Sequence, residues 1–285
     1  MKKSVKRIPL FDRILSDIRT VKIQGAENVA RAGIQAYALR PEKDSIRRIL
    51  DTRPTEPLLQ NAIHLIEKSR NKEKATRIFL SKIRRDHEMI KKHGANLIKN
   101  DMNIYVHCHS STVMDILKYA KINKKKNFIV YTTEVEPLLQ GHITAKDLAK
   151  AKIKVIVAPD LYAEKILSKC DLFLFGADAY TKNFVANKIG TSTLVKLAKY
   201  HHIPRYSCGV SLKFTKKIKL EERPSKEVWD ERESKIQVIN PAFDITPLHE
   251  LSGIVCEFGI LHPNEFVKRA KKSLSDFKQF SKYHA

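Results

Sequence analysis

The sequence of 285 residues predicts an α/β protein with two parts. Residues 1–100 show only helical periodicity, which predicts an all-α N-terminal domain. Residues 101–285 alternate short apolar runs with helical stretches, and this alternation predicts a doubly wound, mainly parallel sheet. The apolar runs are continuous rather than alternating, as expected for strands that are buried on both faces of a sheet.

The first domain is predicted to consist of several packed helices. An apolar stripe begins at Ile14, and residues 29–37 carry the small-residue face of a closely packed helix. Residues 71–99 are strongly charged but have apolar residues at helical spacing, which predicts one long exposed helix.

The second domain contains six predicted strands, at residues 104–106, 128–131, 155–157, 172–175, 206–210 and 254–258. Helical stretches between them cover residues 113–120, 145–151, 162–168 and 193–200. The charged segment 216–235 breaks this alternation and is predicted to be a surface excursion. A basic helix is predicted over residues 265–285.

Composition indicates where the protein resides and which classes of protein it does not belong to. Hydrophobic residues make up 42% of the chain, which is enough for a sizeable core. No apolar run approaches membrane-spanning length, and the Met-Lys-Lys start lacks the apolar segment of a signal peptide, so we expect a cytoplasmic protein with no membrane partner. The four cysteines include no CxxC pair, which argues against a structural zinc site and a disulfide framework.

The charge balance points to anionic partners. There are 54 lysine and arginine residues against 31 aspartate and glutamate residues, a net charge of +23. Such a field favours phosphorylated small molecules or nucleic acid, and a merely solvated basic surface is an equally good interpretation. Basic residues are rarely interleaved with aromatic ones, as an RNA-stacking surface would require.

Cys108 is predicted to lie at a corner between a strand and a helix. The apolar run before it reads as a buried strand, and the polar residues 107–112 precede a helical pattern. In an open α/β sheet, ligands bind at such corners. The N–H groups of the following helix and a protonated neighbouring histidine would stabilise a thiolate there. A packed, unreactive thiol is the alternative, because free cysteine is among the most buried residue types.

Asp178 follows another predicted buried strand, in the sequence Gly-Ala-Asp. If the two strands are parallel, Asp178 and Cys108 lie at the same edge of the sheet. A thiol and a carboxylate could then take separate acid and base roles. The alternative is that Asp178 caps a turn.

Residues 187–191 offer a place for an anion. Lys188 could hold a phosphate, and the N–H groups of Gly190 and Thr191 could bind the same group at the start of the next helix. The alternative is that this segment simply starts a helix. Arg53 could clamp an anion or start a helix, and Asp244 is predicted to fix a loop as a cap. No dinucleotide fingerprint, phosphate loop or HExxH motif is present.

The order of these segments resembles the motifs of one superfamily. It contains the α, β and δ subunits of translation initiation factor 2B, archaeal ribose-1,5-bisphosphate isomerase and methylthioribose-1-phosphate isomerase. The resemblance covers about residues 12–265, and Gly-Ala-Asp with Asn-Lys-Ile-Gly-Thr is its specific signature. The matching segments are Lys22-Ile-Gln-Gly-Ala26, Arg53-Pro-Thr55, His107-Cys-His-Ser110, Thr133-Glu134 with Pro137 and Gln140-Gly141, Gly176-Ala-Asp178, Asn187-Lys-Ile-Gly-Thr191, Lys213-Phe214 and Asn240-Pro-Ala-Phe-Asp-Ile-Thr-Pro247.

The resemblance implies an N-terminal helical domain and a Rossmann-like C-terminal domain that carries the site and forms homodimers, sometimes assembled into hexamers. In the isomerase branches, a cysteine matching Cys108 and an aspartate matching Asp178 transfer the protons that convert an aldose 1-phosphate into a ketose phosphate. No metal or organic cofactor is implied. His-Cys-His-Ser looks especially like ribose-1,5-bisphosphate isomerase, which serves nucleotide salvage. Implied substrate-binding residues are Gln24, Gly25, Arg53, His107, Gln140, Asn187 and Lys188.

Two departures from the isomerases concern phosphate binding. They usually carry arginine where this chain has Gln24, and again where it has Glu136, and a carboxylate near a phosphate is repulsive. The leading hypothesis is an enzyme, a sugar-phosphate isomerase of the ribose-1,5-bisphosphate type. The alternative is a non-catalytic regulatory subunit that binds a nucleotide or sugar phosphate together with translation initiation factor 2. RNA binding by the basic surface is a third hypothesis.

Overall fold

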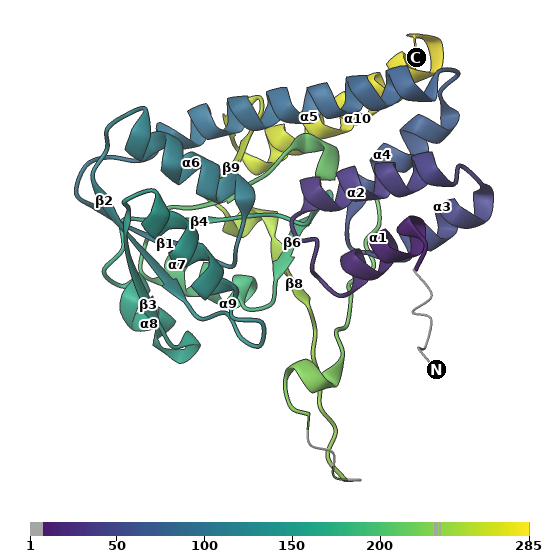
Figure 1. Ribbon diagram of the computed structural model, residues 1–285. Coiled ribbons are helices and arrows are strands. Elements are labelled where there is room, and N and C mark those ends of the chain that lie inside the picture. The colour runs from purple at the N-terminus through teal and green to yellow at the C-terminus, as the bar shows by residue number, and fades with distance from the viewer. Residues whose placement is uncertain (1–7, 231–232, 234, 285) are drawn as a thin grey trace.

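The computed structural model describes residues 8–230, 233 and 235–284, and its first five elements are helices (Figure 1). The long helix predicted over residues 71–99 is confirmed, beginning after Asn71, whose side chain accepts a hydrogen bond from the Lys74 N–H at 2.9 Å, and ending at Ala95. The five helices are α1 (Leu10–Arg19), α2 (Ala26–Leu39), α3 (Lys43–Leu50), α4 (Pro57–Lys68) and α5 (Lys72–Ala95).

A seven-stranded sheet follows, with the order β10-β9-β7-β4-β1-β2-β3. Every neighbouring pair is parallel except β9 and β10, so the predicted α/β class with a doubly wound, mainly parallel sheet is confirmed. The chain runs outward from β1 to β3 and then returns to the other side of β1 for β4. This reversal makes the gap between β1 and β4 the topological switch point, where open α/β sheets bind ligands. The strands are β1 (Met102–His107), β2 (Phe128–Thr133), β3 (Lys154–Ala158), β4 (Leu172–Phe175), β7 (Arg205–Cys208), β9 (Gly253–Cys256) and β10 (Gly259–Leu261).

The two faces of the sheet pack into two apolar clusters. Along β1, Ile104 and Val106 belong to one cluster and Tyr105 to the other, because successive side chains of a strand point to opposite faces. Helices α5 and α10 run side by side along one edge of the molecule (Figure 1), with the rings of Phe79 and Phe277 6.1 Å apart. The remaining helices are α6 (Ser111–Ile122), α7 (Gln140–Lys150), α8 (Ala163–Leu167), α9 (Thr191–Tyr200) and α10 (Pro263–His284), and the short 3-10 turns are η1 (Asp160–Tyr162), η2 (Ser211–Lys213), η3 (Ser225–Glu227) and η4 (Leu248–Glu250).

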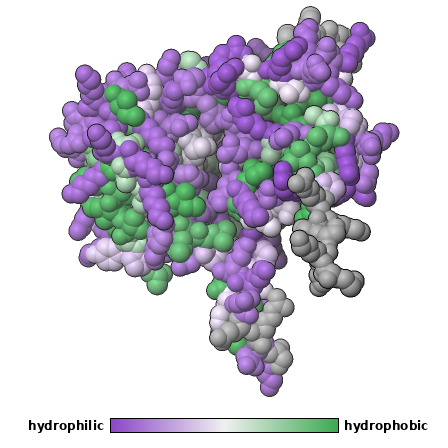
Figure 2. All heavy atoms as spheres, in the orientation of Figure 1, coloured by the Kyte–Doolittle hydropathy of each residue, from purple (hydrophilic) through white to green (hydrophobic). Residues whose placement is uncertain are grey.

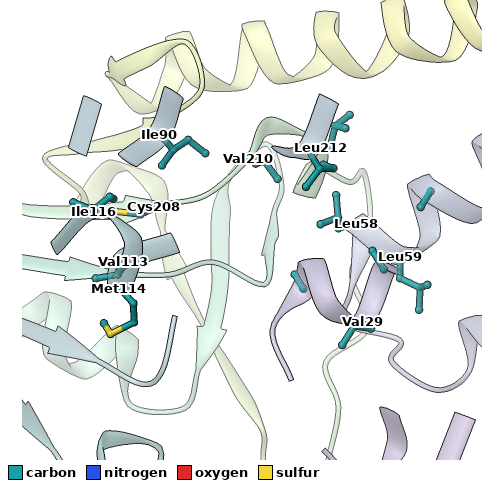
Figure 3. Packing of buried hydrophobic residues seen from close by; sticks show 14 of the residues in the cluster. Val29, Leu58, Leu59, Ile90, Val113, Met114, Ile116, Cys208, Val210 and Leu212 are labelled. Atoms are coloured by element: carbon teal, nitrogen blue, oxygen red, sulfur yellow. The ribbon is translucent and has the colours of Figure 1, made fainter. Parts of the chain in front are cut away.

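The first cluster joins the N-terminal helices to the sheet without a break. Figure 3 shows Leu58 and Leu59 of α4 on one side and Ile116 of α6 and Cys208 of β7 on the other, with Leu212 of η2 beside Leu58. All five side chains are fully buried. The shared core therefore fixes the helices against the carboxyl edge of the sheet.

A second, three-stranded antiparallel sheet has no counterpart among the predicted elements. It consists of β5 (Ala179–Tyr180), β6 (Phe184–Lys188) and β8 (Phe243–Pro247). Asn187 of β6 pairs with Asp244, and Lys188 pairs with Phe243. The interpretation that residues 187–191 simply start a helix is therefore wrong, since α9 begins only at Thr191.

Residues 215–230, 233 and 235–242, called the arm from here on, project from the body of the molecule in Figure 1. The arm is closed at its base, where the Arg223 N–H donates to the Asn240 carbonyl at 2.8 Å and the Ala242 N–H donates to the Glu221 carbonyl at 3.0 Å. A surface excursion was predicted for residues 216–235, of which 231, 232 and 234 lie outside the described residues; the described ones form this excursion, although Glu221 and Arg223 at its base line a cavity. Among the residues that the structure describes, no helix is long and apolar enough to cross a membrane.

Candidate active site

A cavity lies at the switch point, between the ends of β1 and β4 and the first turns of α2 and α6. Figure 2 shows the surface hollowed in this region, between the sheet and helices α1–α4. Eight of the nine residues that the sequence predicted for the site line this one cavity, from six separate parts of the chain: Gln24, Gly25, Arg53, Cys108, Gln140, Asp178, Asn187 and Lys188.

His107 is the exception, because it does not line this cavity. It is the last residue of β1 and points to the same face of the sheet as Tyr105, two residues before it, whereas Cys108 lies beyond the strand. It lines a second cavity, and its Nε2–H donates to the Ile189 carbonyl at 3.0 Å. Burial lowers the pKa of His107 to about 4, so the ring is neutral.

The backbone at Cys108 adopts a left-handed conformation, with φ 65°. A non-glycine residue in this region costs about 1–3 kcal/mol and needs surrounding support. Thr144 supplies it by donating to the Cys108 carbonyl at 3.0 Å, while the Cys108 thiol donates to Gln140 Oε1 at 3.2 Å. Gln140 can reach the thiol because Gly141 lets α7 lie against β2, where a Cβ would overlap the Thr133 carbonyl oxygen.

Of the two interpretations of Cys108 that the sequence allowed, a stabilised thiolate and a packed thiol, its raised pKa favours the thiol. Burial raises the pKa of Cys108 to about 11, and the charge of Lys188 only partly opposes this. The neighbouring His107 is neutral and so cannot supply the expected positive charge. At pH 7 about one molecule in ten thousand carries the thiolate.

Asp178 lines the same cavity and lies in the segment that follows β4. Burial raises its pKa, whereas the positive charges of Lys213, Arg53 and Lys188 lower it. Gly176 allows this run to pass close to α6, since a Cβ there would lie 2.6 Å from Ser110 Oγ. The predicted juxtaposition of Cys108 and Asp178 at one sheet edge is therefore found.

Two carboxyl groups that the sequence analysis missed complete the wall. The Arg53 guanidinium lies 3.3 Å from Glu56 Oε1 and 3.1 Å from Glu221 Oε2. Burial lowers the pKa of Arg53, but the charges of Glu56 and Glu221 outweigh it and the net shift is upward. Glu56 is the N-cap residue of α4 and Glu221 belongs to the arm. No periodicity or motif marks either position.

Four cationic and three acidic side chains line the cavity. Lys213 donates to the Ala177 carbonyl, Arg223 pairs with Glu227, and Arg53 is shared by two carboxyl groups. The Lys188 ammonium is different. The residue is only 8% exposed, and no hydrogen bond or ion pair links its side chain to any residue that the structure describes.

The anion site predicted at Gly190 and Thr191 is wrong, because the chain fills it with its own carboxylate. Asp244 Oδ2 accepts from the Gly190 N–H at 2.9 Å and from the Ser192 N–H at 3.0 Å, so it caps α9 as its sequence suggested. The helix ends that do face the cavity are those of α2 and α6, whose lining residues are Gly25, Ala26, Ser110, Ser111 and Thr112. First-turn N–H groups have no partner within a helix and bind anions.

Glu136 does not face this cavity. It is exposed and lines the second cavity, and its backbone N–H donates to Asp160 Oδ2 at 2.8 Å. The repulsion between Glu136 and a bound phosphate that the sequence suggested is therefore absent. Arg223 from the arm adds a cation to the wall. In the described part of the chain, no group of three or more His, Cys, Asp or Glu side chains is placed to hold a metal ion.

Comparison with known proteins agrees with the motif order. The model of the initiation factor 2 subunit family matches residues 38–263. The chain belongs to this family. The family assignment made from the motifs is thus confirmed.

Relatives of this family member fall into two groups by name. Ribose 1,5-bisphosphate isomerase of Methanocaldococcus jannaschii is 31% identical over 276 residues, which cover 86% of this chain and 89% of that protein. A putative translation initiation factor eIF-2B subunit 2-like protein of Pyrococcus abyssi is 31% identical over 265 residues, covering 88% and 95%. The solved structure of Pyrococcus horikoshii translation initiation factor eIF-2B superposes with a TM-score of 0.82 at 26% identity, covering 91% of this chain and 99% of that one.

Proposed function

We propose that this family member is a sugar-phosphate isomerase of the ribose-1,5-bisphosphate type, which converts an aldose 1-phosphate into a ketose phosphate. The observation that carries the proposal is the meeting of Cys108 and Asp178 in one cavity at the switch point of the sheet. Ribose 1,5-bisphosphate isomerases at about 30% identity over most of the chain support it.

Phosphate binding would use two features of the wall. Lys188 is a mostly buried residue whose ammonium lines the cavity and makes no pair within the described residues, so it can donate up to three charge-assisted hydrogen bonds. The first-turn N–H groups of α6, at Ser111 and Thr112, offer a second phosphate position. Two positions suit a bisphosphate.

The isomerisation moves two hydrogens. The ring bond from C1 to the ring oxygen breaks, C2 loses a proton and C1 gains one, while the C2 hydroxyl loses a proton and the ring oxygen gains one. We assign the proton transfers at carbon to Cys108 and those at oxygen to Asp178. No electrons enter or leave, and each group ends in the protonation state in which it began. Because Cys108 rests as a thiol, we assign a first step in which it passes its proton to Asp178, which gives it to the ring oxygen. Asp178 later takes the proton of the C2 hydroxyl and returns one to Cys108 at the end of the cycle.

In a second candidate function the same cavity binds a ligand but catalyses no isomerisation. A regulatory subunit would bind a nucleotide or sugar phosphate there and contact translation initiation factor 2. The relative named as a putative translation initiation factor subunit, at 31% identity, favours it, as does the neutral Gln24 in the cavity wall.

One assay separates these functions. Ribose 1,5-bisphosphate and 5-methylthioribose 1-phosphate are each incubated with wild type, Cys108→Ser and the control Cys170→Ser, whose thiol is buried outside the cavity. The proposal expects ketose phosphate from wild type and from the control, and none from Cys108→Ser. Absence of ketose from both sugars, together with binding of AMP or initiation factor 2, would establish the second candidate.

A further inference from the structure

Glu56 is a buried carboxyl group in the cavity wall with one oxygen unsatisfied. The residue is 1% exposed, and its Oε1 lies 3.3 Å from an Arg53 guanidinium nitrogen. Its Oε2 is buried and has no hydrogen-bond partner among the residues that the structure describes. A buried polar atom without a partner costs free energy, so such an atom in the wall of a binding cavity calls for a partner on the ligand.

The charges around Glu56 decide its protonation state. Facing it are Asp178 after β4, Lys213 of η2, Glu221 of the arm and Arg53 of its own loop. Glu221 already engages Arg53, and it also accepts the Thr55 N–H at 3.0 Å. Burial and then the charge of Asp178 raise the pKa of Glu56 to about 8. Glu56 is therefore neutral in most molecules at pH 7.

In this neutral form the two oxygens have different tasks. Oε1 accepts from Arg53, which leaves the unpartnered Oε2 to carry the proton, on a residue that lines the cavity. The group that matches this corner is a hydroxyl, since it can accept from Glu56 and donate to Asp178. A phosphate does not match it, because Asp178 and Glu221 would repel the phosphate charge.

We propose that Glu56 is a specificity-determining residue, which donates a hydrogen bond from Oε2 to a sugar hydroxyl of the substrate on the side facing Asp178. The proposal rests on the sugar-phosphate function proposed above. It also specifies how the sugar lies in the cavity: a free hydroxyl faces Glu56, and the phosphates face Lys188 and the first turn of α6. A substrate without that hydroxyl would leave the Glu56 donor unpaired and would be discriminated against.

Glu56→Gln and Glu56→Ala test the proposal, with Glu67→Gln on the same helix but outside the cavity wall as the matched control. Glutamine keeps an acceptor for Arg53 and a donor in place of the Oε2 proton, and it cannot ionise. Calorimetry measures the dissociation constant of ribose 1,5-bisphosphate and of its 2-deoxy and 3-deoxy analogues, between pH 6.5 and 9.5.

The expected results follow from the loss of one donor. At pH 7, Glu56→Gln and Glu67→Gln bind the bisphosphate within about threefold of wild type, while Glu56→Ala binds at least about fivefold more weakly, since one hydrogen bond contributes about 1 kcal/mol or more. As pH rises through about 8, wild type loses the proton of Glu56 and its affinity falls, by up to tenfold per pH unit, whereas that of Glu56→Gln stays level. One deoxy analogue binds wild type at least tenfold more weakly than the parent sugar, and Glu56→Ala abolishes that difference.

The outcomes separate this proposal from the proposed function. If wild type makes ketose but the Glu56 variants share its affinity, its pH profile and its deoxy discrimination, the role of Glu56 is refuted and the isomerase stands. If wild type binds the sugar with the expected Glu56 signature yet makes no ketose, the isomerase is refuted and the role of Glu56 stands. If Glu56→Ala fails to fold, the test still rests on Glu56→Gln, which keeps the shape of the side chain: its affinity between pH 6.5 and 9.5 is compared with that of wild type. Absence of binding by all proteins overturns both.

Discussion

Replacing Glu221 with alanine should detach the base of the arm from the body of the protein. Glu221 reaches across from the arm to the loop before α4, where one of its oxygens lies 3.1 Å from Arg53 Nε and the other accepts the Thr55 N–H at 3.0 Å. The side chains of Glu221 and Arg53 are 11% and 9% exposed, and Thr55 is fully buried. The substitution therefore leaves the buried Arg53 guanidinium with one fewer partner and removes the acceptor of the hydrogen bond from the buried Thr55 N–H.

The magnitude follows from these contacts. Removing one partner of a buried ion pair costs about 3–5 kcal/mol. The lower end applies here, because Glu56 remains beside Arg53 and loss of the Glu221 charge makes Glu56 easier to ionise. We expect the free energy of unfolding of Glu221→Ala to fall by about 3 kcal/mol at pH 7.

Urea unfolding measures this change as a lower midpoint with an unchanged slope. Glu222→Ala is the matched control, since Glu222 is the next residue along the arm but is exposed. Surface substitutions of this kind stay within about 0.5 kcal/mol of wild type. If the two variants unfold within about 0.5 kcal/mol of each other, the arm is not anchored through Arg53 and the reasoning fails.

Three further predictions concern the cavity and the surface. Lys188→Met should weaken binding of ribose 1,5-bisphosphate by roughly tenfold to a hundredfold, the equivalent of one hydrogen bond to a charged group, and unchanged binding in calorimetry would place the phosphate elsewhere. Alkylation of Cys108 by iodoacetamide should speed up about tenfold per pH unit from pH 7 to 10, because only the thiolate reacts and the pKa of the thiol is about 11. A rate that levels off near pH 8 would contradict this raised pKa. Leu161 of η1 is fully exposed and lies in the C-terminal half through which dimers are predicted, and Figure 2 shows apolar surface over β3, α7 and α8. Leu161→Asp should convert a dimer into a monomer in light scattering, and a dimer that persists would exclude this surface.

The sequence was most informative where local pattern and topology agree. Continuous apolar runs gave the parallel strands, and strands that run parallel end at one edge, which is why Cys108 and Asp178 could be placed together before the structure was known. The side that His107 faces was not predictable in this way. It depends on the exact residue at which β1 ends and on the left-handed turn at Cys108, neither of which the apolar run specifies.

Other features depend on contacts between residues far apart in the chain. The strand β6 exists because it pairs with β8, which joins Asn187 to Asp244. The same pairing puts the Asp244 carboxylate on the N-terminus of α9 and closes the anion site that the sequence suggested there. Glu221 meets Arg53 across 168 positions, and no local pattern encodes that contact. The pKa of Cys108 likewise follows from burial, which the sequence does not specify.

The central claim is that the cavity transfers protons on a bound sugar phosphate through Cys108 and Asp178. Single-turnover kinetics tests it most directly, with enzyme in excess over ribose 1,5-bisphosphate and the sugars separated after rapid quenching. Wild type is expected to convert bound sugar to ketose phosphate until equilibrium is reached, whereas Cys108→Ser and Asp178→Asn still bind the sugar but return it unchanged. Conversion by Cys108→Ser at the wild-type rate would contradict the account.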